Sequence, residues 1–148
     1  WASAAGNEVD PDDACGLRVA VQRTTISDQE DVPARSEACV AAGKPEIIKV
    51  QFDTQDEAST AVALGKADAM SADSPISAYA VKQSDGKMQL VGDVFDSAPY
   101  GWPVRKGSEL SAALEAAANK LIESGAFEQI ATNWGVENGL ISQAEIRE

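Results

Sequence analysis

The sequence predicts an α/β fold with a mainly parallel sheet. Short apolar strands alternate with helical segments along the first ninety residues or so, and Gly, Pro, Ser and Thr mark the boundaries between them. That alternation is typical of parallel strands joined by helices. The length of 148 residues suits one ordinary domain, or one lobe of a larger protein.

The first strand and helix lie between Leu17 and Gly43. Leu17–Gln22 is rich in apolar residues and reads as a strand. The segment Asp28–Ala42 has the composition of a helix, with Pro33 in its first turn and Gly43 as its stop.

A second strand and helix follow. Ile47–Phe52 is rich in β-branched residues, which favour strands. Thr54 and Glu57 have the Thr-x-x-Glu spacing of a capping box, so a helix is expected to start there and to end at Gly65.

Shorter elements follow. Ala67–Ala72 and Gln89–Val91 are predicted strands, and Asp73–Pro75 opens a helix because proline is tolerated in a first helical turn. Tyr100–Lys106 is also predicted as a strand, and Pro103 makes it an edge or crossing strand.

Two helices end the predicted order. Ser108 caps an alanine-rich helix that runs to Ser124, and Phe127–Trp134 forms the next one. The first helix carries an apolar stripe at helical spacing, made of Leu110, Leu114, Ala117, Leu121 and Ile122. Such a stripe needs a surface to cover it, and we expect a homodimer or a swapped dimer to supply one.

Composition excludes several classes of function. Twelve basic against twenty-four acidic residues give a net charge of −12, which argues against nucleic acid as a partner. No apolar run approaches the roughly 20 residues that span a bilayer. The acidic stretch at residues 1–14 lacks the glycine and downstream glutamate of a calcium loop, so we interpret it as a solvated acidic loop.

The absence of histidine restricts the chemistry further. It removes Ser–His and Cys–His activation and imidazole ligation of zinc, and two cysteines alone cannot complete a zinc site. We therefore expect no catalytic residue, metal site or cofactor, although carboxylate acid–base chemistry remains open.

Polar residues follow two predicted strands. Thr24 and Thr25 stand between a strand and a helix, where helical N–H groups can bind an anion, and Asp73 follows another strand end. In parallel sheets ligands sit beyond the carboxyl ends of the strands, so these residues are expected to line one crevice. The alternative is that Thr24, Thr25 and Asp73 merely cap helices.

Cys15 and Cys39 are the two cysteines of the chain. A helix packed back on its strand would bring them together, and a bond would close a loop of about 25 residues, contributing about 3 kcal/mol. We favour a disulfide and an exported protein. The alternative is a pair of buried, reduced thiols in a cytosolic protein.

Four stretches in register resemble one family. They are VAVQRTT, FDTQDEASTAVALGKADAMSADSP, PYGWPVRKGSEL and LIESGAFEQIATNWG. Together they resemble the second half of a family 3 extracellular solute-binding protein, the polar amino-acid receptor of an ABC importer. The resemblance runs from about Cys15 to Trp134, and the CG…VAVQ…C pattern is similar to the high-GC Gram-positive branch, in which these two cysteines would be bridged.

This resemblance implies a type II periplasmic-binding-protein fold with two lobes joined by hinge strands. Residues 15–98 would form the second lobe, 99–106 the return hinge, and 107–148 helices that pack on lobe one, after the acidic loop at 1–14. The start at Trp1 rather than Met is then expected to mark a processed or truncated piece that lacks most of lobe one.

The resemblance also implies roles for residues. Thr24 and Thr25 would bind the α-carboxylate of an amino acid and Asp73 its α-ammonium, a charge complementarity that suits a zwitterion. Gln55 matches a position at the pocket rim. Arg23 departs from the glycine of the family pattern Gln-Gly-Thr/Ser-Thr, so it would either crowd the ligand or reach it.

The implied function is a non-enzymatic binding lobe. It would close over an amino acid and deliver it to a membrane permease, outside the cytoplasmic membrane and tethered there as a lipoprotein. Without lobe one, isolated binding is expected to be very weak. The alternatives are a cyclohexadienyl-dehydratase-like enzyme on the same fold, with Asp73 as its acid–base group, and the effector lobe of a LysR-type regulator.

Overall fold

The computed structural model describes residues 1–147, which form two compact units. The first unit is Trp1–Asp93 and the second begins at Val94. Within the described residues, none of the helices has both the length and the apolar character needed to cross a bilayer.

The first unit contains a five-stranded sheet with the order β3-β2-β4-β1-β5. Its strands are β1 (Ala2–Ala4), β2 (Arg18–Gln22), β3 (Ile48–Phe52), β4 (Ala69–Met70) and β5 (Met88–Leu90). β2 runs parallel to β3 and β4, whereas β1 runs antiparallel to both β4 and β5. The predicted α/β fold with a mainly parallel sheet is confirmed, with β1 as its one reversed strand among the described residues.

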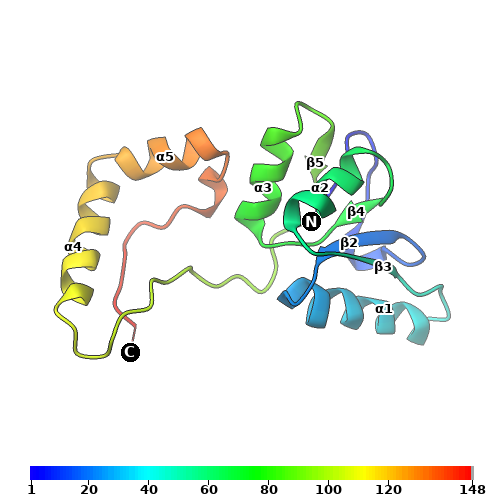
Figure 1. The fold of residues 1–148 in the computed structure, drawn as a ribbon, viewed down its shortest axis with the longest axis horizontal. Coiled ribbons are helices and arrows are strands. Elements are labelled where there is room, and N and C mark those ends of the chain that lie inside the picture. Colours follow the sequence, from blue (N-terminus) through cyan, green and yellow to red (C-terminus); the bar gives the residue numbers. More distant parts are fainter. Residues whose placement is uncertain (148) are drawn as a thin grey trace. The chain divides into compact units, whose positions relative to one another are not determined.

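Helices cover both faces of this sheet, giving three layers (Figure 1). The helices of the unit are η1 (Pro11–Asp13), η2 (Ser27–Asp31), α1 (Val32–Ala41), α2 (Gln55–Ala63) and α3 (Ser74–Gln83). Val19 and Val21 of β2 pack in a cluster with Val32 of α1, while Ala20 between them packs in a cluster with Val62 of α2. The alternation of side chains along a strand therefore divides the core into two halves.

The helix boundaries follow the predicted capping signals. Thr54 and Glu57 form the complete capping box expected at the start of α2. Asp73 holds the N-cap position of α3, with Pro75 in the first turn. The predicted helix from Asp28 is confirmed as two pieces, because the π-helical segment η2 precedes α1.

The N-terminal residues differ from the sequence interpretation. Residues 1–14 were expected to be a solvated acidic loop, and that interpretation is wrong for the first strand. Ala2 and Ser3 of β1 are fully buried, and Trp1 is 6% exposed in the core. Three small residues give no readable alternation, so this strand is defined by its two neighbouring strands and not by local pattern.

The predicted strand Tyr100–Lys106 is also wrong. The structure assigns no strand to these residues, and Tyr100 and Trp102 are exposed. Pro103 lacks an N–H donor, and the apolar residues around it do not join a sheet in the described chain.

The second unit contains α4 (Leu110–Glu123), α5 (Ala126–Trp134) and the short η3 (Glu137–Gly139). Gly125 and Gly135 adopt left-handed conformations at the ends of α5. The side chain of Asn119 in α4 pairs with both backbone groups of Ala144, at 2.8 and 3.2 Å. Ala131 is the one buried apolar residue among the described residues of this unit, so the unit has little core.

Candidate functional site

The carboxyl ends of β2, β3 and β4 meet at one edge of the sheet. The pairs Gln22–Phe52 and Ala20–Met70 set this register, because the three strands are parallel. The residues that follow the strands therefore lie along the same edge. They form three arms, 23–25, 53–55 and 71–73, which contain all five predicted ligand-binding residues.

The first arm is a turn with an unusual backbone at Thr24. The φ angle of Thr24 is +62°, in the left-handed region that β-branched residues rarely adopt. Its N–H donates to Asp28 Oδ2 at 2.9 Å, and its hydroxyl donates to the Arg23 carbonyl at 2.6 Å. Two local hydrogen bonds thus hold Thr24 in this conformation.

Thr25 closes the turn and caps the helical segment after it. Its hydroxyl donates to the Gln22 carbonyl at 2.8 Å and accepts from the Asp28 N–H at 3.3 Å. The capping interpretation of Thr25 is therefore correct. Within residues 1–147, the N–H groups of Thr25 and Ile26 have no protein acceptor, so they remain as donors at the sheet edge.

Asp28 supports this turn from beneath. Its buried carboxylate accepts hydrogen bonds from Thr24 N–H, from Gln51 Nε2 at 2.6 Å, and from Lys49 Nζ at 2.9 Å. The hydrogen bond from Lys49 is the main cause that holds the pKa of Asp28 below its ordinary value, against the opposing effect of burial. Asp28 therefore stays ionised beneath the Thr24 turn.

The remaining predicted residues lie on all three arms. Arg23 pairs with Asp53 across the ends of β2 and β3, with Nε 3.0 Å from Oδ1. Gln55 turns toward the sheet, where its amide lies 3.5 Å from Ser59 Oγ and from Met70 Sδ. Asp73 is exposed after β4, and its side chain does not cap α3. The cap interpretation therefore does not hold for the Asp73 carboxylate.

The predicted disulfide is confirmed. Cys15 and Cys39 are bonded, with their Cα atoms 5.5 Å apart. The bond ties the segment before β2 to the last turn of α1, on the face of the sheet that carries η2. It thereby fixes the helix whose first turns lie at the candidate site.

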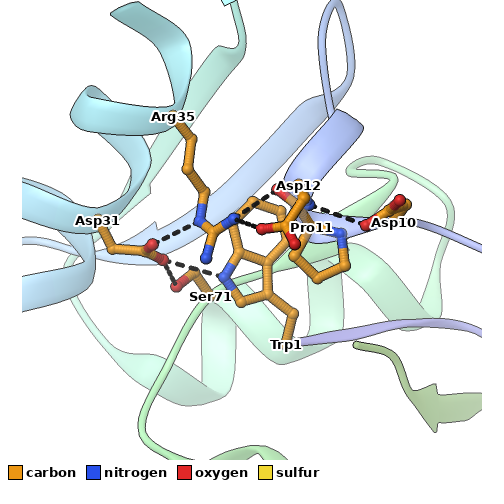
Figure 2. A network of polar contacts seen from close by, with 7 residues as sticks. All are labelled: Trp1, Asp10, Pro11, Asp12, Asp31, Arg35 and Ser71. Carbon is orange, nitrogen blue, oxygen red and sulfur yellow. Dashed lines mark hydrogen bonds and ion pairs between the residues drawn. The ribbon is translucent and has the colours of Figure 1, made fainter. Parts of the chain in front are cut away.

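A second carboxylate, on a largely buried side chain, lies at the end of η2 (Figure 2). Asp31 Oδ2 accepts from the Trp1 indole N–H at 2.9 Å and from the Ser71 hydroxyl at 2.7 Å. Asp31 Oδ1 accepts from Arg35 Nε at 2.6 Å. Arg35 also binds Asp12 at 2.6 Å and stacks over Trp1, with its guanidinium carbon 5.3 Å from the ring centroid.

Sequence reasoning missed these supporting residues. The Thr25-x-x-Asp28 spacing is a cap-like signal that could have identified Asp28. Lys49 and Gln51 alternate along β3 and so share one face of that strand. No local signal connects Trp1, Asp31 and Ser71, because they are 30 or more residues apart and meet only in the folded unit.

Two surface hollows, one beside the Cys15–Cys39 bond and one along α2, include none of Thr24, Thr25 and Asp73. Among the described residues, no group of three or more His, Cys, Asp or Glu is arranged to hold a metal ion. The chemistry present is hydrogen-bond donors on one arm and a carboxylate on another.

No family model matches this chain. The arginine-binding protein ArgT of Corynebacterium glutamicum is 45% identical over 150 residues, covering 100% of this chain and 49% of ArgT. The ABC transporter glutamine-binding protein GlnH of Bacillus subtilis is 33% identical over 91 residues, covering 61% of this chain and 33% of GlnH.

Solved structures show the same similarity. An ancestral arginine-binding protein bound to arginine matches with a TM-score of 0.63 and 28% identity, covering 90% of this chain and 57% of that one. The arginine-, lysine-, histidine-binding protein ArtJ from Geobacillus stearothermophilus matches with a TM-score of 0.57 and 26% identity, covering 90% of this chain and 56% of ArtJ.

The matches cover most of this chain but only part of each relative. The chain spans about half the length of ArgT and a third of the length of GlnH. The sheet has the periplasmic-binding-protein-like fold of the matched structures. Over its full length the chain is homologous to about half of ArgT, and it resembles part of the family 3 extracellular solute-binding proteins in sequence and in fold.

Proposed function

We propose that this chain is a ligand-binding part of an amino-acid-binding protein that serves an ABC importer. Its sheet edge would bind the α-carboxylate and the α-ammonium of an amino acid. The observation that carries this proposal is the homology to ArgT over the whole chain, combined with donors and a carboxylate on neighbouring arms. ArgT is named for arginine and GlnH for glutamine, so a polar amino acid is the proposed ligand.

The first arm supplies the proposed carboxylate site. The unpaired N–H groups of Thr25 and Ile26 lie at the start of a helical segment, where the backbone favours an anion. The hydroxyls of Thr24 and Thr25 already donate to backbone carbonyls, so in this role they would act mainly as acceptors or would have to reorient. We assign the backbone N–H groups the larger part of the interaction.

The third arm supplies the proposed ammonium site. Asp73 projects from the end of β4, the strand directly beside β2 in the sheet. The Asp73 carboxylate would bind the ligand's ammonium, and the N–H donors of the first arm would bind the ligand's carboxylate. Together they would select an α-amino acid over a simple acid or amine. Arg23 and Gln55 are assigned to the rim, where the Arg23–Asp53 ion pair would contact the ligand side chain.

The proposal extends to the domain organisation. Residues 15–98 are proposed as the second of two lobes, 99–106 as the return hinge, and 107–148 as helices that pack on the first lobe. Two-lobed receptors close around their ligand by hinge motion. The closed form would be presented to membrane permease subunits, with the protein tethered as a lipoprotein outside the cytoplasmic membrane.

The non-enzymatic role is favoured over the alternatives by the matched relatives. ArgT and GlnH are binding proteins by name, as is the ancestral protein solved with arginine. A dehydratase-like enzyme would need a second positioned acid beside Asp73. A LysR-type effector lobe would be cytosolic, where a disulfide such as Cys15–Cys39 is unusual.

The test is an NMR titration of the isotope-labelled chain with L-arginine and L-glutamine. Binding should be weak, because in the proposed two-lobed receptor the first lobe would also contact the ligand. The amide shifts should be concentrated at 24–27 and 72–74. Asp73→Asn should abolish them, whereas Glu37→Gln, an exposed change on α1, should leave them intact.

Two analogues of arginine identify the recognised groups. Agmatine lacks the carboxylate and 5-guanidinopentanoate lacks the α-ammonium, so each should lose part of the affinity. Site-specific shifts with L-arginine that survive Asp73→Asn would contradict the ammonium assignment. The absence of localised shifts with any L-amino acid would overturn the proposed function of this edge.

A further inference from the structure

Asp31 connects two arms of the sheet edge. It is the last residue of η2, the π-helical segment that begins two residues after Thr25. Its carboxylate accepts a hydrogen bond from the hydroxyl of Ser71, which lies two residues before Asp73 (Figure 2). A single side chain therefore joins the helical segment that follows the proposed carboxylate site to the strand end that carries the proposed ammonium site.

We infer that Asp31 is a positioning residue for the amino-acid site, acting through Ser71 to hold the Thr25 and Asp73 arms in register. The inference rests on the proposed function of these arms. Asp31 would not touch the ligand, since its three hydrogen-bond donors are all protein groups and its side chain is only 10% exposed.

The three hydrogen-bond donors around Asp31 fix the orientation of its carboxylate. Trp1 N–H and Ser71 O–H converge on Oδ2, while Arg35 Nε occupies Oδ1. Movement away from any of them would leave a poorly solvated polar group without its partner, which is costly. Arg35 is itself held by Asp12 and the Pro11 carbonyl, at 2.6 and 2.8 Å.

Ser71 connects Asp31 to the third arm of the site. Its N–H donates to the Ala20 carbonyl at 3.1 Å, which continues the pairing of β4 with β2, and its hydroxyl binds Asp31. Ser71 is 2% exposed. The chain therefore leaves the sheet toward Asp73 from a point held on two sides.

The π-helical form of η2 is consistent with a functional role. π-Turns occur mostly as short interruptions of helices and are frequent at functional sites. Here the segment places two carboxylates, Asp28 beneath the Thr24 turn and Asp31 against Ser71. The first and third arms thus receive support from the same five residues.

The chain offers a matched control for a purely structural role. Asp68 also accepts three hydrogen bonds, from Arg18 N, Nε and Nη2 at 2.8, 3.1 and 2.7 Å. It lies directly before β4 and faces Arg18, the first residue of β2. Asp68 is therefore at the amino ends of these two strands, whereas the candidate site is at their carboxyl ends. Asp68→Asn should destabilise the unit without disturbing the ligand edge.

The experiment compares Asp31→Asn, Ser71→Ala and Asp68→Asn with the unchanged chain. Each is titrated with L-arginine by NMR, under conditions where denaturation curves show the chain to be folded. We expect Asp31→Asn to weaken binding about tenfold and Ser71→Ala about threefold, with Asp68→Asn within about twofold. Ser71→Ala keeps the inference testable if Asp31→Asn does not fold.

A second measurement separates positioning from general loosening. Because Ser71 acts on the Asp73 arm, Ser71→Ala should reduce the preference for L-arginine over 5-guanidinopentanoate, which has no ammonium. Unchanged affinity and preference in Ser71→Ala would overturn the inference and leave the proposed function standing. If the unchanged chain binds no amino acid, the proposed function fails, and this inference fails with it.

Discussion

At the scale of single residues, the candidate site depends on backbone geometry as much as on side chains. Thr24 holds a φ angle of +62°, which costs a non-glycine residue roughly 1–2 kcal/mol. The N–H hydrogen bond to Asp28 offsets part of this cost. A glycine would adopt this conformation without the cost, so the threonine stores strain at the edge proposed to bind the ligand.

This strain predicts an unusual order of stability. Thr24→Ala and Thr24→Gly both remove the hydroxyl, but only glycine relieves the left-handed backbone. Thr24→Gly should be the more stable variant by about 1 kcal/mol, whereas at ordinary positions the alanine variant is favoured. Urea unfolding monitored by tryptophan fluorescence measures the difference. An alanine variant that is more stable would show that Thr24 is not strained in solution.

The depressed pKa of Asp28 predicts how stability depends on pH. The folded-state pKa lies below the unfolded value of about 3.9, so the unfolded chain binds a proton first as the pH falls. The stabilisation by Asp28 is therefore complete only about one pH unit above the unfolded value, and it is lost as the pH falls from there through the folded pKa. Lys49 is the main cause.

The measurement is the unfolding free energy at a series of pH values between neutral and strongly acidic. The Asp28→Asn variant should be less stable than the parent at pH 7, and the two curves should converge in acid. Asp68, whose pKa the hydrogen bond from Arg18 lowers, keeps its own acid dependence in that variant. Parallel curves for the parent and Asp28→Asn would mean that Asp28 titrates alike in both states.

At the scale of elements, local signals identified what local physics determines. The capping box of α2, the strands β2 and β3, and the cap at Thr25 each depend on neighbouring residues, and each was predictable. The burial of β1 and the contacts of Asp31 depend on partners far along the chain. The arms of the site could be predicted from sequence, and the Thr25-x-x-Asp28 spacing points to Asp28, but the contacts of Asp31 with Trp1 and Ser71 could not be predicted.

A further prediction concerns the loop that follows β5. Gly92 has a φ angle of +70°, and a Cβ there would lie 2.5 Å from Cγ of Pro11. Gly86 has a similar φ angle of +78° but no atom within 4 Å of the same position. In both alanine variants the left-handed backbone conformation costs roughly 1–2 kcal/mol of stability. Only Gly92→Ala must also displace Pro11.

Thermal unfolding of Gly86→Ala and Gly92→Ala tests this contact. Gly92→Ala should have the lower Tm, because Pro11 begins the short helix beside Asp12, and Asp12 binds Arg35. Equal Tm values would show that the η1 segment moves aside freely. In that case the Asp12–Arg35 end of the network would contribute little to the fold.

At the scale of the whole molecule, the two units differ in what holds them together. The first unit has two apolar clusters and a disulfide, whereas in the second unit Ala131 is the one buried apolar side chain among the described residues. Its larger apolar side chains, including Leu110, Leu121, Ile130 and Trp134, are exposed. The apolar stripe anticipated from the sequence is therefore without a core of its own.

This difference predicts separate local stabilities. Amide hydrogens in α4 and α5 should exchange much faster than those in β2 and α1, because few buried contacts oppose local opening of these helices. Hydrogen exchange followed by mass spectrometry, at several protein concentrations, measures this directly. Protection of α4 and α5 that rises with concentration would indicate that a second copy covers the stripe, as in the expected dimer. Protection equal to that of β2 at every concentration would contradict the prediction, because it would require a cover within the chain itself.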